Sequence, residues 1–182
     1  LSKKLAAGLD GLILDVKCGT GAFMKSLLEA KTLASALVKT ANLIGCKTLA
    51  LVSDMNEPLA PSSGNSVEIK DVMDVLVHAK TGRLKELSLR LGAELLKTNG
   101  LCATVEDGIK KLNKQLDKGH AAEAFAKMVS ALGGPVGFVD DYSRFLPEAP
   151  VILEVFAPKE GYISGWDSEA LGLCTVNLGG GR

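Results

Sequence analysis

Apolar residues near the start of the chain form two short runs with a helical repeat between them. Leu12 to Val16 and Thr48 to Val52 are nearly continuous apolar runs, which is typical of buried strands. From about Lys25 to Ile44, apolar residues recur every three or four positions, which predicts a helix that Gly45 ends. A strand, a helix and a second strand with short joints form a βαβ unit, so we expect the two strands to be parallel.

The middle of the chain is predicted to be helical. A loop rich in Pro, Ser and Gly runs from Glu57 to Asn65 and precedes four apolar stripes with helical spacing. The stripes are Ile69, Val72, Met73 and Leu76; Leu84, Leu87, Leu91 and Leu95; Ile109, Leu112 and Leu116; and Ala124, Phe125, Met128, Val129 and Leu132. Thr104, three residues before Asp107, is typical of a helix cap and predicts where the third helix begins.

The pattern changes after Pro147 and Pro150. Val151 to Ala157 is an apolar run that predicts another strand. Asp167 is predicted to cap a short helix that extends to about Leu178. We therefore expect an α/β fold with many helices, and a domain or subdomain boundary near residues 147–150.

Composition and charge exclude several classes of protein. Lys and Arg number 21, as do Asp and Glu, so the formal net charge is zero and the basic excess typical of nucleic-acid-binding proteins is missing. A hydrophobic fraction of 47% with 23% charged residues indicates a folded core. No apolar stretch reaches the roughly 18 residues needed to cross a bilayer. We expect a soluble cytoplasmic protein that binds neither nucleic acid nor membrane.

Cysteine and histidine residues show no metal-binding pattern. They are widely separated along the chain, at Cys18, Cys46, Cys102, Cys174, His78 and His120. Zinc sites and dense disulfide frameworks need closer or paired spacing. We expect reduced thiols that pack as small apolar groups.

A glycine loop follows the first predicted strand. Leu12 to Phe23 reads LILDVKCGTGAF, and glycine in such a loop lets the backbone approach a ligand closely. The shape resembles the cofactor loop of S-adenosylmethionine-dependent methyltransferases, but Lys17 stands where that pattern has glycine. The acid at the end of the next strand, Asp54, also lies much farther on than the roughly 20 residues that ribose binding needs. From the residues alone, a structural turn and a ligand cradle both remain open.

Seven segments spread over nearly the whole chain match a known family in one register. They are SKKLAAGLD at 2–10, LDVKCGTGAFM at 14–24, SDMNEPLA at 53–60, SGNSVEIKDV at 63–72, GHAAEAFAKMV at 119–129, the segment Tyr142–Pro147 and LGGGR at 178–182. Together they resemble pyrimidine nucleoside phosphorylases. DMNEPLA favours the thymidine phosphorylase branch of that family.

The resemblance implies both a fold and a reaction. Residues 1–9 would be the last helix of a small helical domain, residues 10–147 an α/β glycosyltransferase domain, and residues 148–182 the start of a C-terminal α+β domain. The implied reaction, part of pyrimidine nucleoside salvage, converts thymidine and phosphate to thymine and 2-deoxy-α-D-ribose 1-phosphate. The enzyme would be a cytoplasmic homodimer that uses inorganic phosphate as co-substrate and requires no cofactor.

The resemblance also assigns roles to individual residues. Lys3 matches a catalytic, substrate-binding lysine that hydrogen-bonds a carbonyl oxygen of the base, where an ammonium group would stabilise the departing pyrimidine anion. Phe23 matches a substrate-binding position beside C5 of the base. Leu59, Ser62 and Asp71 match positions that hold a monovalent cation such as K⁺ in one branch, although that branch more often has Glu in place of Asp71.

The resemblance places the remaining site residues, including those that bind phosphate, before Lys3. We therefore expect this chain to be a piece of a longer enzyme and the piece alone to be inactive. The alternatives are a phosphorylase of uridine or nucleoside monophosphates, an S-adenosylmethionine-dependent methyltransferase, and a fragment with no enzymatic role.

Overall fold

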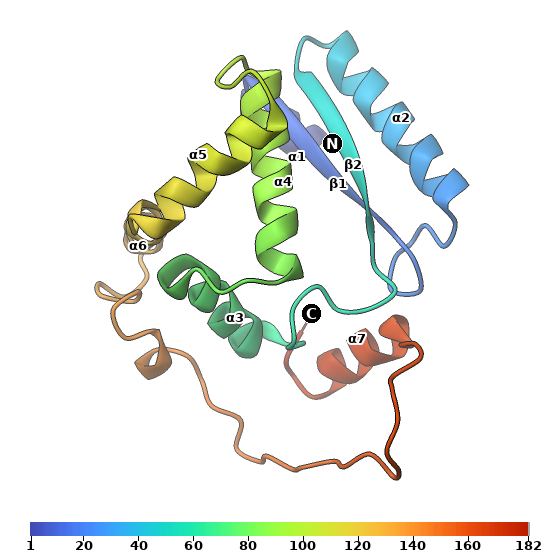
Figure 1. Ribbon diagram of the computed structural model, residues 1–182, viewed down its shortest axis with the longest axis vertical. Coiled ribbons are helices and arrows are strands. Elements are labelled where there is room, and N and C mark those ends of the chain that lie inside the picture. Colours follow the sequence, from blue (N-terminus) through green and yellow to red (C-terminus); the bar gives the residue numbers. More distant parts are fainter. Residues whose placement is uncertain (182) are drawn as a thin grey trace.

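The computed structural model describes residues 1–181 and contains a parallel pair of strands. β1 (Gly11–Cys18) and β2 (Lys47–Asp54) are joined by α2 (Leu27–Leu43). The strands align from Gly11 opposite Lys47 to Cys18 opposite Asp54. The predicted βαβ unit is therefore confirmed, and Figure 1 shows it as the blue and cyan part of the chain.

Helices cover both faces of the strand pair. On one face, Val16 packs with Ala30 and Ala34 of α2, and these small side chains let the helix approach the strands closely. On the other face, α4 (Arg83–Thr98) packs against both strands, and the side chain of Asn99 lies against the start of β1. Coverage on two faces agrees with the nearly continuous apolar runs that predicted these strands.

Further helices complete the fold. They are α1 (Ser2–Leu5), α3 (Asn65–His78), α5 (Val105–Asp117), α6 (His120–Ala131), the short 3₁₀ helix η1 (Tyr142–Arg144) and α7 (Ser168–Asn177). The four predicted apolar stripes correspond to α3, α4, α5 and α6. Thr104 caps α5 as predicted, because its hydroxyl accepts a hydrogen bond from the backbone N–H of Asp107 at 3.1 Å. The fold class is α/β with many helices, as expected from the sequence.

The helices after β2 have a core of their own. α3 packs against α4, α5, α6 and η1. Met73 of α3 is 0% exposed and is the largest fully buried side chain among the described residues. Ala93 of α4 is also fully buried, beside Gly108 of α5, where an added Cβ would lie 2.9 Å from the Ala93 Cβ. This second core fixes α3 and α4, which carry side chains of the candidate site described below.

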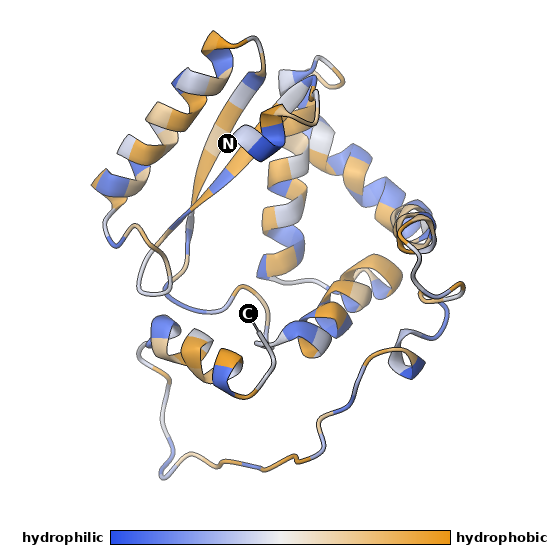
Figure 2. Ribbon diagram, turned by 180° about the vertical axis from the view of Figure 1, so that it is seen from behind, coloured by the Kyte–Doolittle hydropathy of each residue, from blue (hydrophilic) through white to orange (hydrophobic). Residues whose placement is uncertain are grey.

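The predicted strand at Val151–Ala157 is wrong. This segment lies between η1 and α7 and runs along the outside of the molecule, where Val155 is 92% and Phe156 80% exposed (Figure 2). Within residues 1–181 it pairs with neither β1 nor β2, and a strand requires a partner for its backbone N–H and C=O groups. The helix after it is confirmed, because Asp167 caps α7 by accepting the Ala170 N–H at 2.9 Å.

The start of the chain is less helical than expected, since α1 covers only Ser2–Leu5 and the following residues form a turn. The division into domains at residues 9 and 147 stays a prediction. Among the described residues, no helix has both the length and the apolar character that spanning a bilayer would require.

A capping box starts α2 and makes the stability of this helix depend on pH. The Ser26 hydroxyl accepts the Glu29 N–H at 3.3 Å, and the Glu29 carboxylate accepts the Ser26 N–H at 3.0 Å. The Ser26 backbone N–H, followed by the Ser26 hydroxyl, holds the pKa of Glu29 below its ordinary value of 4.5. A lowered pKa in the folded protein means that the carboxylate stabilises the fold above the unfolded-state pKa and loses this effect as the pH falls.

We therefore predict that Glu29→Gln destabilises the protein more at about pH 7 than at about pH 3, because protonation of Glu29 as the pH falls removes the charged acceptor that the variant lacks at every pH. Urea denaturation of both proteins across this range would measure the difference in unfolding free energy. If the difference in unfolding free energy is the same at both pH values, the charge of Glu29 does not contribute to the capping box.

Candidate functional site at the carboxyl ends of the strands

The loops that follow β1 and β2 are joined at the carboxyl ends of the two strands. The Met55 N–H donates to the Cys18 carbonyl at 2.7 Å, and the Gly21 N–H donates to the Met55 carbonyl at 2.9 Å. Gly19 has a φ of +134°, and a Cβ added there would meet the side chain and backbone N of Asn56. Open α/β sheets bind ligands at this end of the strands, so this edge is the candidate site.

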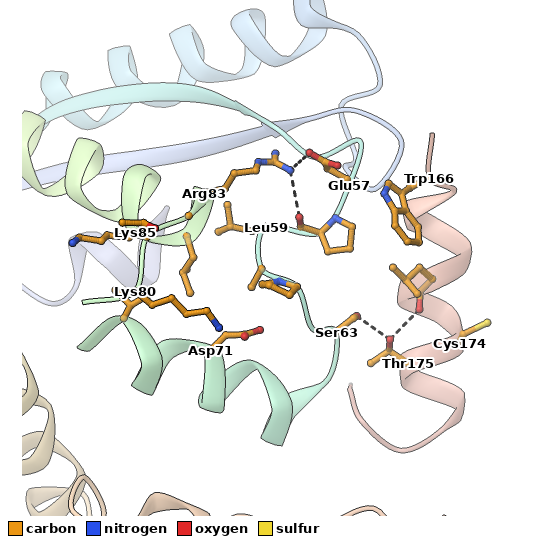
Figure 3. Close-up of a pocket in the computed structure, with 18 of the residues that line it drawn as sticks. Glu57, Leu59, Ser63, Asp71, Lys80, Arg83, Lys85, Trp166, Cys174 and Thr175 are labelled. Carbon is orange, nitrogen blue, oxygen red and sulfur yellow. Dashed lines mark hydrogen bonds and ion pairs between the residues drawn. The ribbon is translucent and has the colours of Figure 1, made fainter. Parts of the chain in front are cut away.

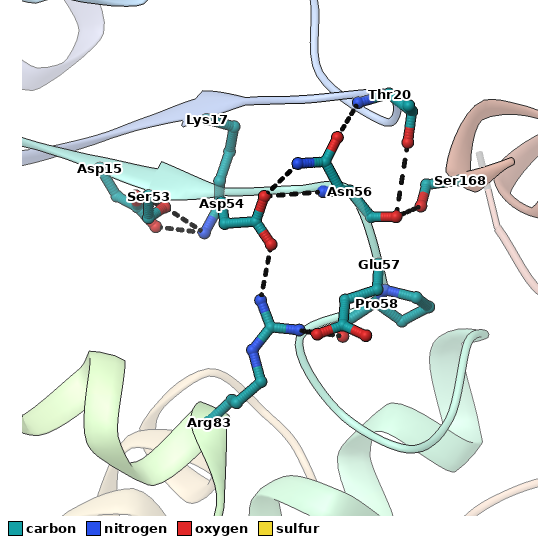
Figure 4. A network of polar contacts seen from close by, with 10 residues as sticks. All are labelled: Asp15, Lys17, Thr20, Ser53, Asp54, Asn56, Glu57, Pro58, Arg83 and Ser168. Atoms are coloured by element: carbon teal, nitrogen blue, oxygen red, sulfur yellow. Dashed lines mark hydrogen bonds and ion pairs between the residues drawn. The ribbon is translucent and has the colours of Figure 1, made fainter. Parts of the chain in front are cut away.

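A polar network links these loops to the start of α4 (Figure 4). Asp54, the last residue of β2, accepts hydrogen bonds from the Asn56 N–H and from the Arg83 guanidinium, each at 3.2 Å. Arg83 also pairs with Glu57, and the Asn56 side-chain oxygen accepts the Thr20 N–H at 3.0 Å. Asp54 is thus engaged within the protein, which argues against the ribose-binding role that a methyltransferase would give it.

The start of α7 and the residues just before it are hydrogen-bonded to the same network. The Ser168 hydroxyl at the start of α7 donates to the Asn56 carbonyl at 2.8 Å, and the Thr20 hydroxyl donates to the Trp166 carbonyl at 3.3 Å. Lys25 and Glu169 form an ion pair at 2.8 Å. Residues more than a hundred positions apart along the chain therefore meet at the glycine loop.

A cavity of about 620 Å³ lies beside this network, between the loop after β2, α3, the start of α4, and α7 (Figure 3). Most of its wall is apolar, with Leu59, Leu171 and Trp166 among the lining residues. Its volume is that of an ordinary small-molecule pocket. The charged groups around it have partners inside the protein, since Arg83 pairs with Glu57 and Lys80 with Asp74.

The structure does not bring the two predicted base-binding residues into this cavity. Lys3 is an exposed residue of α1, and the Phe23 side chain is 99% exposed in the glycine loop. As far as residues 1–181 show, neither lines the cavity. The roles of Lys3 and Phe23 stay predictions that rest on the family resemblance alone.

The three predicted cation-binding residues do lie close together. Leu59 and Asp71 line the cavity, and the Ser62 N–H donates to the Asp71 carboxylate at 3.2 Å. However, the ammonium group of Lys80 lines the same cavity and faces Asp71 (Figure 3). Ser62 thus offers Asp71 an N–H donor and Lys80 offers it a positive charge, a combination that does not suit an additional cation. Within the described part of the chain, no group of three or more His, Cys, Asp or Glu residues could hold a metal.

Lys17, which stands where the methyltransferase loop has glycine, is bound within the sheet. Its ammonium group forms an ion pair with Asp15 on the same strand and donates to the Ser53 hydroxyl on β2 at 3.0 Å (Figure 4). Ser53 in turn donates to Asp15. These half-buried groups satisfy one another across the strand pair, so their arrangement is that of a structural cluster.

No pattern in the sequence singled out Arg83 or Trp166 as site residues. Arg83 pairs with Asp54 and Glu57, which lie far from it along the chain, so no local sequence pattern predicts these contacts. Trp166 is the only tryptophan of the chain and comes directly before the cap of α7, and its rarity is the one sequence signal that points to it.

The match to a known family covers most of the elements that build this site, with α7 outside it. Residues 1–122 match the family described as "Glycosyl transferase family, a/b domain". The matched part includes the βαβ unit, the glycine loop, the Arg83 network and the loop along the cavity. This family indicates pentosyl transfer, as in nucleoside phosphorylases, and it favours a transferase of glycosyl groups over a methyltransferase. The chain belongs to the glycosyl transferase family and carries its a/b domain.

Proposed function

We propose that this chain is part of a pyrimidine nucleoside phosphorylase of the thymidine phosphorylase branch. The observation that carries the proposal is the set of seven matching segments, most of which fall within the glycosyl transferase a/b domain. One of them, SDMNEPLA, forms the end of β2 and the loop along the cavity and favours the thymidine branch. Family membership supports pentosyl transfer, and these segments support thymidine as the nucleoside.

The proposed reaction is a displacement at C1′ of the deoxyribose. A phosphate oxygen forms a bond to C1′ while the bond from C1′ to the base nitrogen breaks, and the electron pair of that bond leaves with the base. The thymine anion then takes up a proton, and 2-deoxy-α-D-ribose 1-phosphate is the second product. The ammonium group of Lys3 hydrogen-bonds a carbonyl oxygen of the base and stabilises the negative charge that develops there. Phe23 packs beside the methyl group of thymine.

The proposed enzyme acts as a cytoplasmic homodimer. Phosphate supplies the nucleophile, so the reaction needs no redox or organic cofactor. The partners of the protein are then two small molecules, thymidine and inorganic phosphate, together with a second copy of the enzyme.

We predict that Lys3→Ala, in the enzyme as its gene encodes it, lowers kcat/KM for thymidine at least tenfold. A charge-assisted hydrogen bond contributes roughly 1.5–3 kcal/mol, and a tenfold change in rate corresponds to about 1.4 kcal/mol. Lys4→Ala is the matched control, since Lys4 is the next residue and is also exposed on α1. Phosphate-dependent release of thymine is the measurement.

Three kinds of result would overturn the proposal, each at a different level. If Lys3→Ala and Lys4→Ala have equal kinetics, Lys3 does not contact the base. If uridine is cleaved and thymidine is not, the branch is wrong. Phosphate-independent activity, or binding of S-adenosylmethionine without any nucleoside cleavage, would overturn the phosphorylase itself.

A further inference from the structure

Lys80 pairs with one carboxylate of α3 and faces a second carboxylate one helical turn away. Lys80 and Asp74 form an ion pair at 2.8 Å. Lys80 and Asp71 both line the cavity, and the Lys80 ammonium group faces Asp71 there (Figure 3). Ala79 brings Lys80 to this position, because its left-handed conformation, φ +51°, ends α3 and turns the chain back on the helix. Ala79 is the only residue other than glycine with a positive φ among the described residues.

The surroundings of Asp71 complete this arrangement. The Ser62 N–H donates to the Asp71 carboxylate at 3.2 Å and ties the loop after β2 to α3. Hydrogen bonding and charge from Asp74, followed by the charge of Asp71, raise the pKa of Lys80, so its ammonium group remains protonated at neutral pH. Lys85 lines the same cavity and donates to the Ala79 carbonyl at 3.1 Å. Lys85 is thus bound to the backbone, and Lys80 is the lysine that faces the two carboxylates.

We propose that the ammonium group of Lys80 is a built-in counter-ion of Asp71 and takes the place of an exchangeable monovalent cation. The loop that carries Leu59 and Ser62 is then held on α3 by groups of the protein alone. This inference concerns ion binding and stability, and it stands whether or not the protein cleaves thymidine.

The test compares thermal unfolding of the wild-type protein and of Lys80→Met in potassium chloride and in tetramethylammonium chloride at equal ionic strength. Methionine keeps much of the length of the side chain and removes its charge. We expect the unfolding midpoint of the wild type to be the same in both salts. The midpoint of Lys80→Met should rise with potassium alone and reach a plateau, because a cation that binds only the folded state stabilises it. Lys85→Met, the matched control, should show no potassium-specific rise.

Each result decides the proposal. A potassium-specific rise in the wild type, or its absence in folded Lys80→Met, overturns it. A rise in Lys80→Met that disappears when Asp71→Asn is added supports it and locates the ion at Asp71. If Lys80→Met does not fold, calorimetric titration of the wild-type protein with potassium chloride decides, since saturable heat overturns the proposal and its absence supports it.

Discussion

Gly19→Ala is expected to lower the free energy of unfolding by about 2–4 kcal/mol and to separate the two loops at the carboxyl ends of the strands. The backbone at Gly19 has a φ of +134°, which residues with a side chain rarely adopt. An added Cβ would also lie 2.8 Å from the backbone N of Asn56 and 2.7 Å from its side-chain oxygen. A backbone atom cannot move aside as the end of a flexible side chain can, so the loop after β2 would have to shift.

The control Gly45→Ala separates the backbone strain from the steric clash with Asn56. Gly45 also has a positive φ, +88°, but an added Cβ there would meet nothing within 4 Å. Gly45→Ala should therefore cost only the conformational strain, about 1–2 kcal/mol. Urea denaturation of both variants gives the two free energies. If they are equal, the glycine loop and Asn56 are not in the close contact that defines the candidate site.

The βαβ unit was predictable from the sequence because its signals are local. The apolar runs at Leu12–Val16 and Thr48–Val52 are long enough to be recognised, and the helical repeat between them has a clear end at Gly45. A crossover between two neighbouring strands makes them parallel, so the topology followed from the element order. The main error at these elements was length, since both strands extend slightly beyond their apolar residues.

The strand prediction at Val151–Ala157 failed for the opposite reason. A run of apolar residues shows that a segment has the side chains typical of a strand. A strand forms, however, only where a partner elsewhere in the fold lies beside it. The same holds for the candidate site, where Arg83 and Asp54 meet through tertiary packing of α4 on the strands. For Lys3 the sequence offered a role by resemblance, whereas its exposed position on α1 provides no geometry that supports it.

Met73→Ala is expected to lower the free energy of unfolding by a similar amount, because Met73 lies in the second core. Met73 was predicted as part of an apolar stripe, and the structure buries it completely where α3 meets the helices that follow. Truncating a fully buried methionine costs about 2–5 kcal/mol, because transfer energy is lost and a cavity remains. α3 also carries Asp71 and Asp74, so we expect the cavity beside the strands to lose one of its walls in the same variant. Denaturant unfolding gives the free energy.

Met128→Ala on α6 is the matched control for this prediction. The residue type and the secondary structure are the same, but Met128 is 48% exposed, so only about 1 kcal/mol should be lost. Equal costs for the two substitutions would mean that α3 is not the centre of the helical core. Packing around α3 could then not be what holds Asp71 and Lys80 in place, and the wall of the cavity would depend on the βαβ unit and α7 alone.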